Sequence, residues 1–260
     1  MCDLTAGDLS AFSKACYRAQ TAVKSRAHYV SKIAALRGMP GVGDYELLRV
    51  RTAEQHFLPP LLDGLGDVSG RTALEIGCGK GLKAAVFGDF FQRYVGVDLN
   101  QNHVAIAQQN LLRIGSRAEC YVANGIEVAR SSRKFGFEKA PDVLILFAVL
   151  EHLLPSERVE LLHHVRSVVA GGGAVLFAET PNRLIAHDAH SSQLHFAQSL
   201  PPELMIRYVQ KSRHEPWLWA LRQWGNDTTA LYRAGVGLSF HDFELDFADD
   251  TRDMPFVFSS

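Results

Sequence analysis

The stretch Leu74-Glu75-Ile76-Gly77-Cys78-Gly79-Lys80-Gly81 decides the fold. It includes most of a short apolar run, residues 72–76, that is typical of a buried strand, and residues 80–91 after it have a helical pattern. Glycine lets the backbone turn sharply after a strand and come close to a ligand, because no side chain intervenes. The sequence therefore predicts a strand, a glycine turn and a helix, with a ligand at the turn.

A second short strand is predicted at residues 94–98, and it ends on Asp98. A carboxylate at this place can accept hydrogen bonds from both hydroxyls of a ribose. Together with the glycine turn, it indicates a cofactor that contains adenosine. The nicotinamide fingerprint requires glycine where this chain has Leu82, and no GxxxxGK phosphate-binding loop is present, so a different adenosyl cofactor is favoured.

Further strands and helices alternate along the chain. Strands are predicted at residues 120–122, 143–147 and 174–177, with helices at 44–65, 101–114 and 156–169. Continuous apolar strands separated by helices indicate a parallel sheet covered on both faces, which binds ligands at the carboxyl ends of its strands. The alternation of Phe243, Leu245 and Phe247 with acids predicts a late, half-exposed strand at the sheet edge.

The chain is predicted to form a single domain of four parts. Apolar residues at spacings of three and four between positions 9 and 34 predict a helical cover at the N-terminus. The parts are an N-terminal helical cover (1–66), a cofactor-binding core (67–179), a substrate or lid insertion (180–237) and a final strand with its tail (238–260). Trp217, Trp219 and Trp224 in the insertion fit a packed cover, or a flat wall for an aromatic acceptor.

Four collinear motifs resemble one enzyme family. They are residues 74–81, Val97-Asp98, DVLILFAVLEHL at 142–153 and GGAVLFAETPNRL at 172–184. Together these motifs resemble class I S-adenosylmethionine-dependent methyltransferases of the small-molecule type, over about residues 45–185. The resemblance implies an α/β, Rossmann-like sheet of seven mostly parallel strands, with helices on both faces and an antiparallel last strand.

The resemblance also implies which residues hold S-adenosyl-L-methionine. The glycine turn would line the methionine portion, Glu75 would hold the turn near the ammonium group, Asp98 would bind the ribose, and Leu99 would pack against the adenine. Apart from the resemblance, Arg49 and Arg51 of the N-terminal segment stand near the expected cofactor mouth, and one of them is expected to meet the carboxylate; Arg51 is chosen here over Arg49. The expected cofactor-binding residues are therefore Glu75, Gly77, Cys78, Gly79, Gly81, Asp98, Leu99, Asn124, Gly125, Ile126, Phe147, Ala148 and Arg51.

The catalytic residues are expected after the fourth and fifth strands. An oxygen acceptor needs a base near neutral pKa, and histidine is the natural candidate. Glu151 and His152 follow the fourth strand, where the resemblance places a Glu-His pair close to the acceptor of several N-methyltransferases; alternatively, they only open a helix. His187 and His190 follow the fifth strand, beside Asp188 and His195, and could equally belong to a polar lid loop. This spacing matches no metal signature, so no metal ligand is predicted.

Composition excludes several classes of function. Lys and Arg total 27 against 28 for Asp and Glu, a formal net charge of −1, which argues against a nucleic-acid partner. No apolar stretch approaches membrane-spanning length, no secretory pattern is present at the N-terminus, and the four cysteines form no CxxC pair, so a cytoplasmic protein without a membrane partner is expected.

The sequence thus predicts a methyltransferase that acts on an oxygen or nitrogen of a small-molecule acceptor. It leaves the oligomeric state open and allows a homodimer. The alternatives are an NAD(P)-dependent oxidoreductase on a Rossmann-like sheet, and a cofactor-binding protein without catalytic activity.

Overall fold

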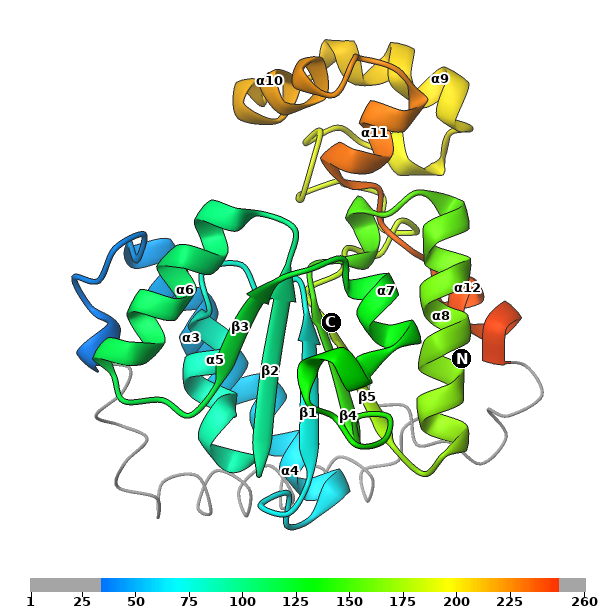
Figure 1. Ribbon diagram of the computed structural model, residues 1–260. Coiled ribbons are helices and arrows are strands. Elements are labelled where there is room, and N and C mark those ends of the chain that lie inside the picture. The colour runs from blue at the N-terminus through cyan, green and yellow to red at the C-terminus, as the bar shows by residue number, and fades with distance from the viewer. Residues whose placement is uncertain (1–33, 248–260) are drawn as a thin grey trace, which may run out of the picture. The chain divides into compact units, whose positions relative to one another are not determined.

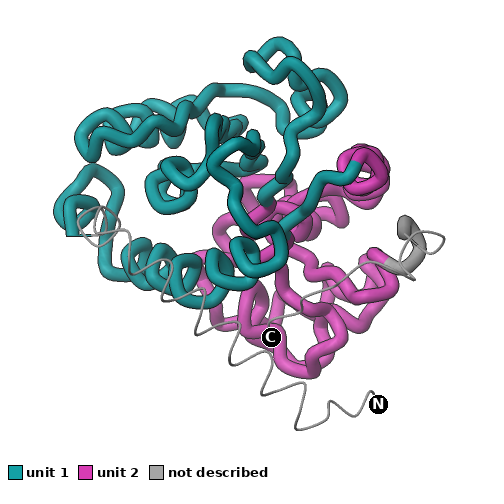
Figure 2. The backbone as a smooth tube through the Cα atoms, turned by 90° about the horizontal axis from the view of Figure 1, so that it is seen from below, with its two compact units in different colours: residues 1–145, 172–176, 255–260 teal, residues 146–171, 177–254 magenta. Residues whose placement is uncertain are grey.

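The computed structural model describes residues 34–247 (Figure 1). Half of the predicted N-terminal helical cover, residues 1–33, and the predicted tail at residues 248–260 lie outside the described residues. Contacts divide the chain into two compact units, coloured separately in Figure 2. Of the described residues, the first unit comprises 34–145 and 172–176, and the second 146–171 and 177–247.

Five strands form the sheet within the described residues. They are β1 (Thr72–Ile76), β2 (Arg93–Asp98), β3 (Glu119–Val122), β4 (Val143–Phe147) and β5 (Ala174–Ala178), in the order β3-β2-β1-β4-β5. β1 pairs with β2 and β2 with β3 in parallel, with Leu74 opposite Val95 and Gly96 opposite Cys120. The order of the strands reverses beside β1, so the glycine turn at the end of β1 lies at the switch point where such sheets bind ligands.

Two of the helices of the first unit begin at an asparagine cap. The helices of this unit are α3 (Asp44–Thr52), a π-helical turn (Ala53–Phe57), α4 (Leu58–Leu65), α5 (Leu82–Phe87), α6 (Gln101–Arg113) and α7 (Gly125–Arg130), and the two that begin at the cap are α6 and α7. The Asn100 side chain accepts hydrogen bonds from the N–H groups of Asn102 and His103 and so caps α6. Figure 1 shows α5 and α6 on one side of β1–β3 and α7 on the other, as predicted for a sheet covered on both faces.

The starts of β1 and β4 are joined through one carboxylate. Asp142, the residue before β4, accepts hydrogen bonds at Oδ2 from the N–H (2.8 Å) and the hydroxyl (3.0 Å) of Thr72, the first residue of β1. Lys139 makes an ion pair with the same carboxylate at 2.7 Å. This contact fixes the register of the two strands next to the switch point, although it lies at the end of the sheet away from the glycine turn.

The second unit is mainly helical within the described residues. Its helices are α8 (Pro155–Ala170), α9 (Pro202–Tyr208), α10 (Glu215–Gln223), α11 (Thr228–Gly235) and α12 (Phe240–Phe247). A buried cluster between α9, α10 and α11 includes Met205, Leu221 and Leu231. Trp217 also belongs to it and donates its indole N–H to the carbonyl of Ala234 (2.9 Å), whereas Trp219 and Trp224 are exposed. Trp217 is therefore a core residue and not a wall for an acceptor.

The prediction of a late strand at residues 243–247 is wrong. These residues belong to α12, which begins after Ser239. The N–H and the hydroxyl of Ser239 both donate to the carboxylate of Asp242 (2.7 and 2.9 Å), a capping contact that starts a helix. Phe240, Phe243 and Phe247 also fit a helical spacing, and the cap decides between the two patterns. The expected antiparallel last strand is thus absent from residues 240–247, and the sheet of residues 34–247 has five strands, not seven.

None of the helices of residues 34–247 combines the length and the hydrophobicity that crossing a membrane would need.

Candidate active site

The glycine turn is closed by its own hydrogen bonds. The N–H groups of Gly77 and Cys78 donate to the carbonyl of Val97 on β2 (2.8 and 3.0 Å), and that of Gly81 donates to Cys78 (2.9 Å). Gly77, Gly79 and Gly81 have φ values of 75°, 52° and 73°, in the left-handed region that favours glycine. The backbone of this turn therefore has the conformation that the three glycines predict.

Two of these glycines have different surroundings. A Cβ atom added at Gly81 would lie 2.8 Å from the Cβ of Ala107, so Gly81 lets α5 pack closely against α6. A Cβ atom added at Gly79 would meet no atom within 4 Å. Gly81 is therefore required by packing, whereas Gly79 borders open space that a ligand can occupy.

Asp98 joins the glycine turn to the end of β2. Its Oδ2 accepts the N–H of Gly79 (2.9 Å) and its Oδ1 accepts the N–H of Asn100 (2.8 Å). Each carboxylate oxygen offers two acceptor positions, so both oxygens can still accept a hydroxyl group. Leu99, directly after it, is 74% exposed although it is apolar, as expected of a side chain that a flat ligand covers.

Glu75 and Cys78 are buried below the turn. Glu75 accepts a hydrogen bond from the hydroxyl of Tyr94 (2.9 Å), and burial together with this carboxylate raises the pKa of Tyr94 well above its usual range. A hydrogen bond to Cys120 and burial raise the pKa of the Cys78 thiol far above its usual range. Cys78 is therefore a neutral packing group and not a nucleophile.

Asn124, Gly125 and Ile126 form the start of α7. The Oδ1 of Asn124 accepts the N–H of Ile126 (3.0 Å), so the predicted adenine contact is also the helix cap. A Cβ atom added at Gly125 would lie 2.2 Å from a methyl carbon of Ile76, which makes Gly125 necessary for the packing of α7 against β1. Ile126 is 8% exposed. The helix start alone thus accounts for these three residues, and their contact with a cofactor stays a prediction.

The N-terminal segment reaches the glycine turn through a lysine. Lys80 donates to the carbonyl of Gly41 (2.9 Å) and makes an ion pair with Glu46 of α3 (3.1 Å). Arg51, the predicted partner of the cofactor carboxylate, is exposed at the end of α3, where its charge acts on Glu54. Lys80 thus joins the N-terminal segment to the turn, and the contact of Arg51 with the cofactor carboxylate stays a prediction.

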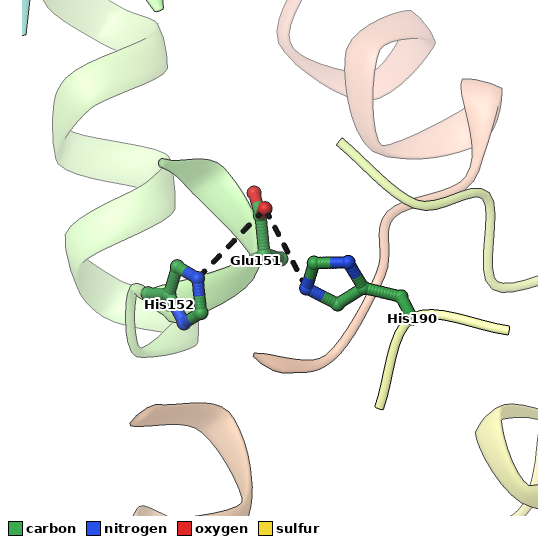
Figure 3. Close-up of side chains that lie close together, drawn as sticks. All are labelled: Glu151, His152 and His190. Carbon is green, nitrogen blue, oxygen red and sulfur yellow. Dashed lines mark ion pairs between the residues drawn. The ribbon is translucent and has the colours of Figure 1, made fainter. Parts of the chain in front are cut away.

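In the second unit, Glu151, His152 and His190 point toward one another (Figure 3). The Oε1 of Glu151 lies 3.9 Å from the Nε2 of His152 and 3.9 Å from the Nε2 of His190. Glu151 is fully buried, whereas 44% of the His152 side chain and 36% of the His190 side chain remain exposed. Three of the four predicted catalytic residues thus form one cluster, a buried acid with two accessible imidazoles.

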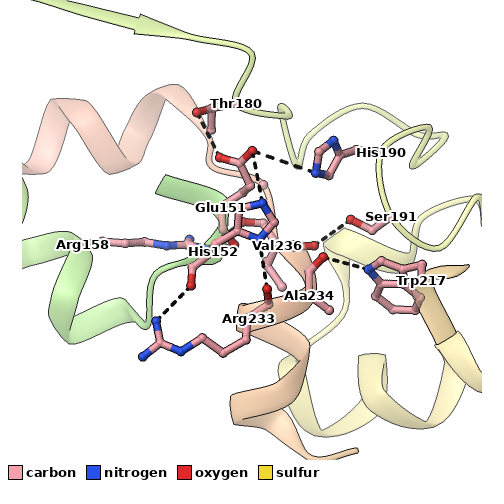
Figure 4. A network of polar contacts seen from close by, with 12 residues as sticks. Glu151, His152, Arg158, Thr180, His190, Ser191, Trp217, Arg233, Ala234 and Val236 are labelled. Carbon is pink, nitrogen blue, oxygen red and sulfur yellow. Dashed lines mark hydrogen bonds and ion pairs between the residues drawn. The ribbon is translucent and has the colours of Figure 1, made fainter. Parts of the chain in front are cut away.

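Polar neighbours hold this cluster in place (Figure 4). The Nδ1 of His152 lies 3.0 Å from the carbonyl oxygen of Arg233, and since a carbonyl only accepts, the proton is on Nδ1 and the lone pair on Nε2. Burial, helped by the charges of Arg158 and Arg233, lowers the pKa of His152. Thr180 donates to the Oε2 of Glu151 (3.3 Å). His152 is therefore held with Nδ1 toward a carbonyl and Nε2 toward Glu151, and its lowered pKa favours the neutral imidazole.

Arg158 fixes the backbone of the same segment. It is 6% exposed, and its guanidinium donates to the carbonyls of Leu153 (3.0 Å), Glu151 (3.3 Å) and Val236 (2.7 Å). Arg233 makes a bidentate ion pair with Glu157 at 2.7 Å for both bonds, which holds the pKa of that carboxyl below its usual range. These two arginines position the chain around His152.

The fourth predicted catalytic residue, His187, lies in a different pair. It forms an antiparallel bridge with His195, and their ring centroids are 4.9 Å apart. The buried carboxylate of Asp188, next to His187 in the chain, accepts the N–H groups of Ser191 and Ser192 (2.9 and 2.8 Å) and the Ser192 hydroxyl (2.7 Å). Asp188 therefore shapes the loop that carries His190.

Two backbone positions beside the cluster are strained. Ala148, directly after β4, and Glu179, directly after β5, have φ values of 53° and 61°, which is uncommon for residues other than glycine. The N–H of Ala148 donates to the carbonyl of Ala178 (2.9 Å). Phe147 before it is 3% exposed, as a core residue would be. Such strain at strand ends is typical of functional sites.

The sequence reasoning did not identify Thr180, Arg158 and Arg233 as site residues. Thr180 could have been found, because it comes two residues after β5 and so at the carboxyl end of a strand, like Asp98. Arg233 acts on His152 through its main-chain carbonyl, and Arg158 binds carbonyls of segments distant in the chain. These main-chain contacts leave no trace in residue type or spacing.

Comparison with known proteins identifies the family. A family model described as a methyltransferase domain matches residues 50–226, more than half of the chain. The chain belongs to this methyltransferase family. The resemblance to class I S-adenosylmethionine-dependent methyltransferases that the sequence motifs carry is thereby confirmed.

Individual relatives are more distant. A probable S-adenosylmethionine-dependent methyltransferase of Mycolicibacterium smegmatis is 29% identical over 116 residues, 45% of this chain and 40% of that protein. The YcgJ protein of Bacillus subtilis (16% identity, TM-score 0.46) matches over 73% of this chain and 64% of that one. Magnesium protoporphyrin IX methyltransferase of Synechocystis with bound SAH (19% identity, TM-score 0.37) matches over 54% and 62%. The chain thus covers less than two thirds of the length of each of these three relatives.

We expect alanine substitutions at Gly79 and at Gly81 to reduce stability by different amounts. Gly79→Ala and Gly81→Ala both place alanine in the left-handed region, at a cost of about 1–2 kcal/mol. Gly81→Ala also brings its Cβ atom against Ala107 and should cost about 1–3 kcal/mol more. Urea unfolding of both variants measures the difference, and equal losses of stability would contradict this distinction.

Proposed function

We propose that the protein transfers a methyl group from S-adenosyl-L-methionine to an oxygen or nitrogen of a small-molecule acceptor. The observation that carries the proposal is the family match over residues 50–226, combined with a carboxylate, Asp98, that borders an open glycine turn. The adenosyl cofactor supplies a methyl group on a positively charged sulfur. The residues of this chain have to bind it, orient it, and handle the proton of the acceptor.

The first unit carries the residues proposed to hold the cofactor. Asp98 would accept both ribose hydroxyls, with Leu99 against the adenine and Asn124, Gly125 and Ile126 at its edge. Gly77, Gly79 and Gly81 would line the methionine portion, near Glu75 and Cys78. The remaining contacts proposed are the backbone carbonyls of Phe147 and Ala148 to the ammonium group, and Arg51 to the carboxylate.

The hydrogen bonds of the turn favour this cofactor over a dinucleotide. A pyrophosphate is bound by N–H groups that are directed at it. The N–H groups of Gly77 and Cys78 donate to the carbonyl of Val97, that of Gly79 to Asp98, and that of Gly81 to the carbonyl of Cys78. These four donors are thus engaged within the protein, and the turn offers close backbone approach, which suits an uncharged or positively charged ligand. This supports the methyltransferase over the NAD(P)-dependent alternative.

The second unit carries the residues proposed to act on the acceptor. Glu151 follows four residues after the end of β4, whose strand neighbour is β1. A hydroxyl acceptor must lose its proton as the methyl group moves, and the Nε2 lone pair of His152 or His190 can accept it. The buried carboxylate of Glu151, 3.9 Å from both rings, would stabilise the imidazolium that forms. An amine acceptor needs the same groups for orientation.

The net charge of −1 supports a small molecule as acceptor, because a nucleic-acid substrate is usually met by a surplus of basic residues.

The alternative function is that of a protein that binds the cofactor but has no catalytic activity. Incubation with labelled S-adenosylmethionine and a small-molecule extract separates the two, since only an enzyme moves the label to a metabolite.

The cofactor assignment predicts the effect of Asp98→Ala. Loss of both acceptors should raise the dissociation constant for S-adenosylhomocysteine by at least about tenfold, measured by titration calorimetry. Asp67→Ala is the matched control, because Asp67 also accepts two hydrogen bonds in a turn, but before β1 and not after β2. Unchanged affinity in a folded Asp98→Ala variant would refute the role of this carboxylate.

Substitution of the two histidines beside Glu151 should affect methyl transfer but not cofactor binding. His152→Ala and His190→Ala should slow label transfer about 100-fold, the usual contribution of a positioned base, and leave the affinity for S-adenosylhomocysteine unchanged. His195→Ala, an exposed histidine of the same loop, should transfer label at the normal rate. Full activity in both His152→Ala and His190→Ala would mean that the enzyme works by alignment alone.

A further inference from the structure

Two chain segments that are distant in sequence bring three potential metal ligands together. The Oε1 of Glu151 and the Nε2 atoms of His152 and His190 all lie within 4.8 Å of one another. We propose that Glu151, His152 and His190 form a binding site for a divalent cation of the zinc type. The sequence alone predicts no metal, because its spacing rules compare neighbours, and His190 is far from the Glu151-His152 pair in the chain.

The three donor atoms lie slightly farther apart than the ligands of one bound zinc ion. Zinc binds carboxylate oxygen and imidazole nitrogen at about 2.0–2.2 Å in a tetrahedral arrangement, so two ligand atoms of one ion lie about 3.3–3.6 Å apart. The carboxylate oxygen is 3.9 Å from each of the two nitrogens. The two nitrogens lie within 4.8 Å of each other, so movements of about 1 Å by the two partly exposed imidazole rings bring all three atoms to the separations that one ion requires.

The neighbours of the ligand atoms resemble the surroundings of a metal site. A histidine that binds a metal usually donates its other ring N–H to a carboxylate or a carbonyl. His152 does so, since its Nδ1 bonds to the carbonyl of Arg233 at 3.0 Å and its Nε2 faces Glu151. Thr180 binds Oε2 of Glu151, which directs the other oxygen, Oε1, toward the two histidines.

His190 is held from both sides of its loop. The hydroxyl of Ser191 donates to the carbonyl of Gly235 (2.7 Å), and the carbonyl of Ser191 meets the Nδ1 of His214 (2.7 Å). A Cβ atom added at Gly235 would be 3.4 Å from Nε2 of His190, so the end of α11 packs against this ring. The backbone around His190, the third proposed ligand, is therefore fixed by contacts with the rest of the second unit.

The two arginines near the cluster are directed elsewhere. Arg233 is engaged with Glu157 through two bonds of 2.7 Å. The guanidinium of Arg158 donates to three main-chain carbonyls and stacks on Tyr232, 5.3 Å from its ring centroid. Arg233 also donates to the main-chain carbonyl of His152 (3.1 Å). The hydrogen bonds of both guanidinium groups thus go to atoms other than the three proposed donor atoms.

The donor set selects the class of cation. Two imidazoles and one carboxylate suit zinc and its neighbours, whereas magnesium and calcium prefer oxygen ligands. Three protein ligands leave a coordination position for water or for an oxygen of a substrate, as in zinc enzymes with two histidines and a glutamate. Bound zinc would engage the lone pairs of both rings, so the ion and an imidazole base are alternative states of this cluster. Binding of the ion does not depend on the proposed methyl transfer.

Calorimetric titration of the full-length, chelator-treated protein with zinc tests the proposal. We expect saturable binding of one equivalent that His190→Ala and Glu151→Gln each weaken by at least about tenfold. His195→Ala is the matched control, an exposed histidine five residues further along the same loop, and should bind zinc like the unchanged protein.

Thermal unfolding of each variant without metal shows whether it folds. His190 is partly exposed, so His190→Ala should fold even if the buried change Glu151→Gln does not, and it then decides the question. The proposal is overturned if zinc does not bind, or if it binds His190→Ala as tightly as the unchanged protein. Neither result would affect the test of cofactor binding at Asp98.

Discussion

The two hydrogen bonds that the Asp98 carboxylate accepts are the constraint on which the first unit depends. One comes from Gly79 in the turn after β1 and the other from Asn100, which caps α6. The same side chain therefore sets the path of the glycine turn and the start of the following helix. Because each oxygen keeps an acceptor position, the group that shapes the turn can also bind the ligand that the turn surrounds.

The second unit depends on a different kind of constraint. The buried Arg158 binds carbonyls at Glu151, Leu153 and Val236, which lie in two distant parts of the chain. It thereby fixes the segment that carries Glu151 and His152 against the segment that follows α11. A buried charge that satisfies several carbonyls is costly to disturb, so the position of this acid and its histidines is set by the fold.

Much of the first unit could be predicted from the sequence. The five strands occur where apolar runs and glycines indicate them, and local patterns are clearest for β1, β2 and β4, which are almost wholly buried. The strand predicted at residues 243–247 failed because Phe243 and Phe247 fit two periods equally well, and the contact of Ser239 with Asp242 decides for a helix. The prediction considered only residues 243–247, whereas the capping contact lies before them, between Ser239 and Asp242.

The candidate site was predictable only in part. Asp98 and Glu151 could be found because they follow strands, and position after a strand is visible in a sequence. The convergence of His190 with Glu151, the separate pairing of His187 with His195, and the loop-shaping role of Asp188 all depend on contacts across the fold. Thr180 and Arg233 complete the surroundings of the cluster through one hydroxyl and one main-chain carbonyl, which residue spacing does not reveal.

The central claim is that the glycine turn and Asp98 together bind one adenosyl cofactor. A crystal structure grown with S-adenosylhomocysteine tests it most directly. The account predicts both ribose hydroxyls within hydrogen-bonding distance of the Asp98 carboxylate, with the sulfur beside Gly79. It would be contradicted if the adenosyl group were bound elsewhere, or if the turn excluded it and Asp98 kept only its bonds to Gly79 and Asn100.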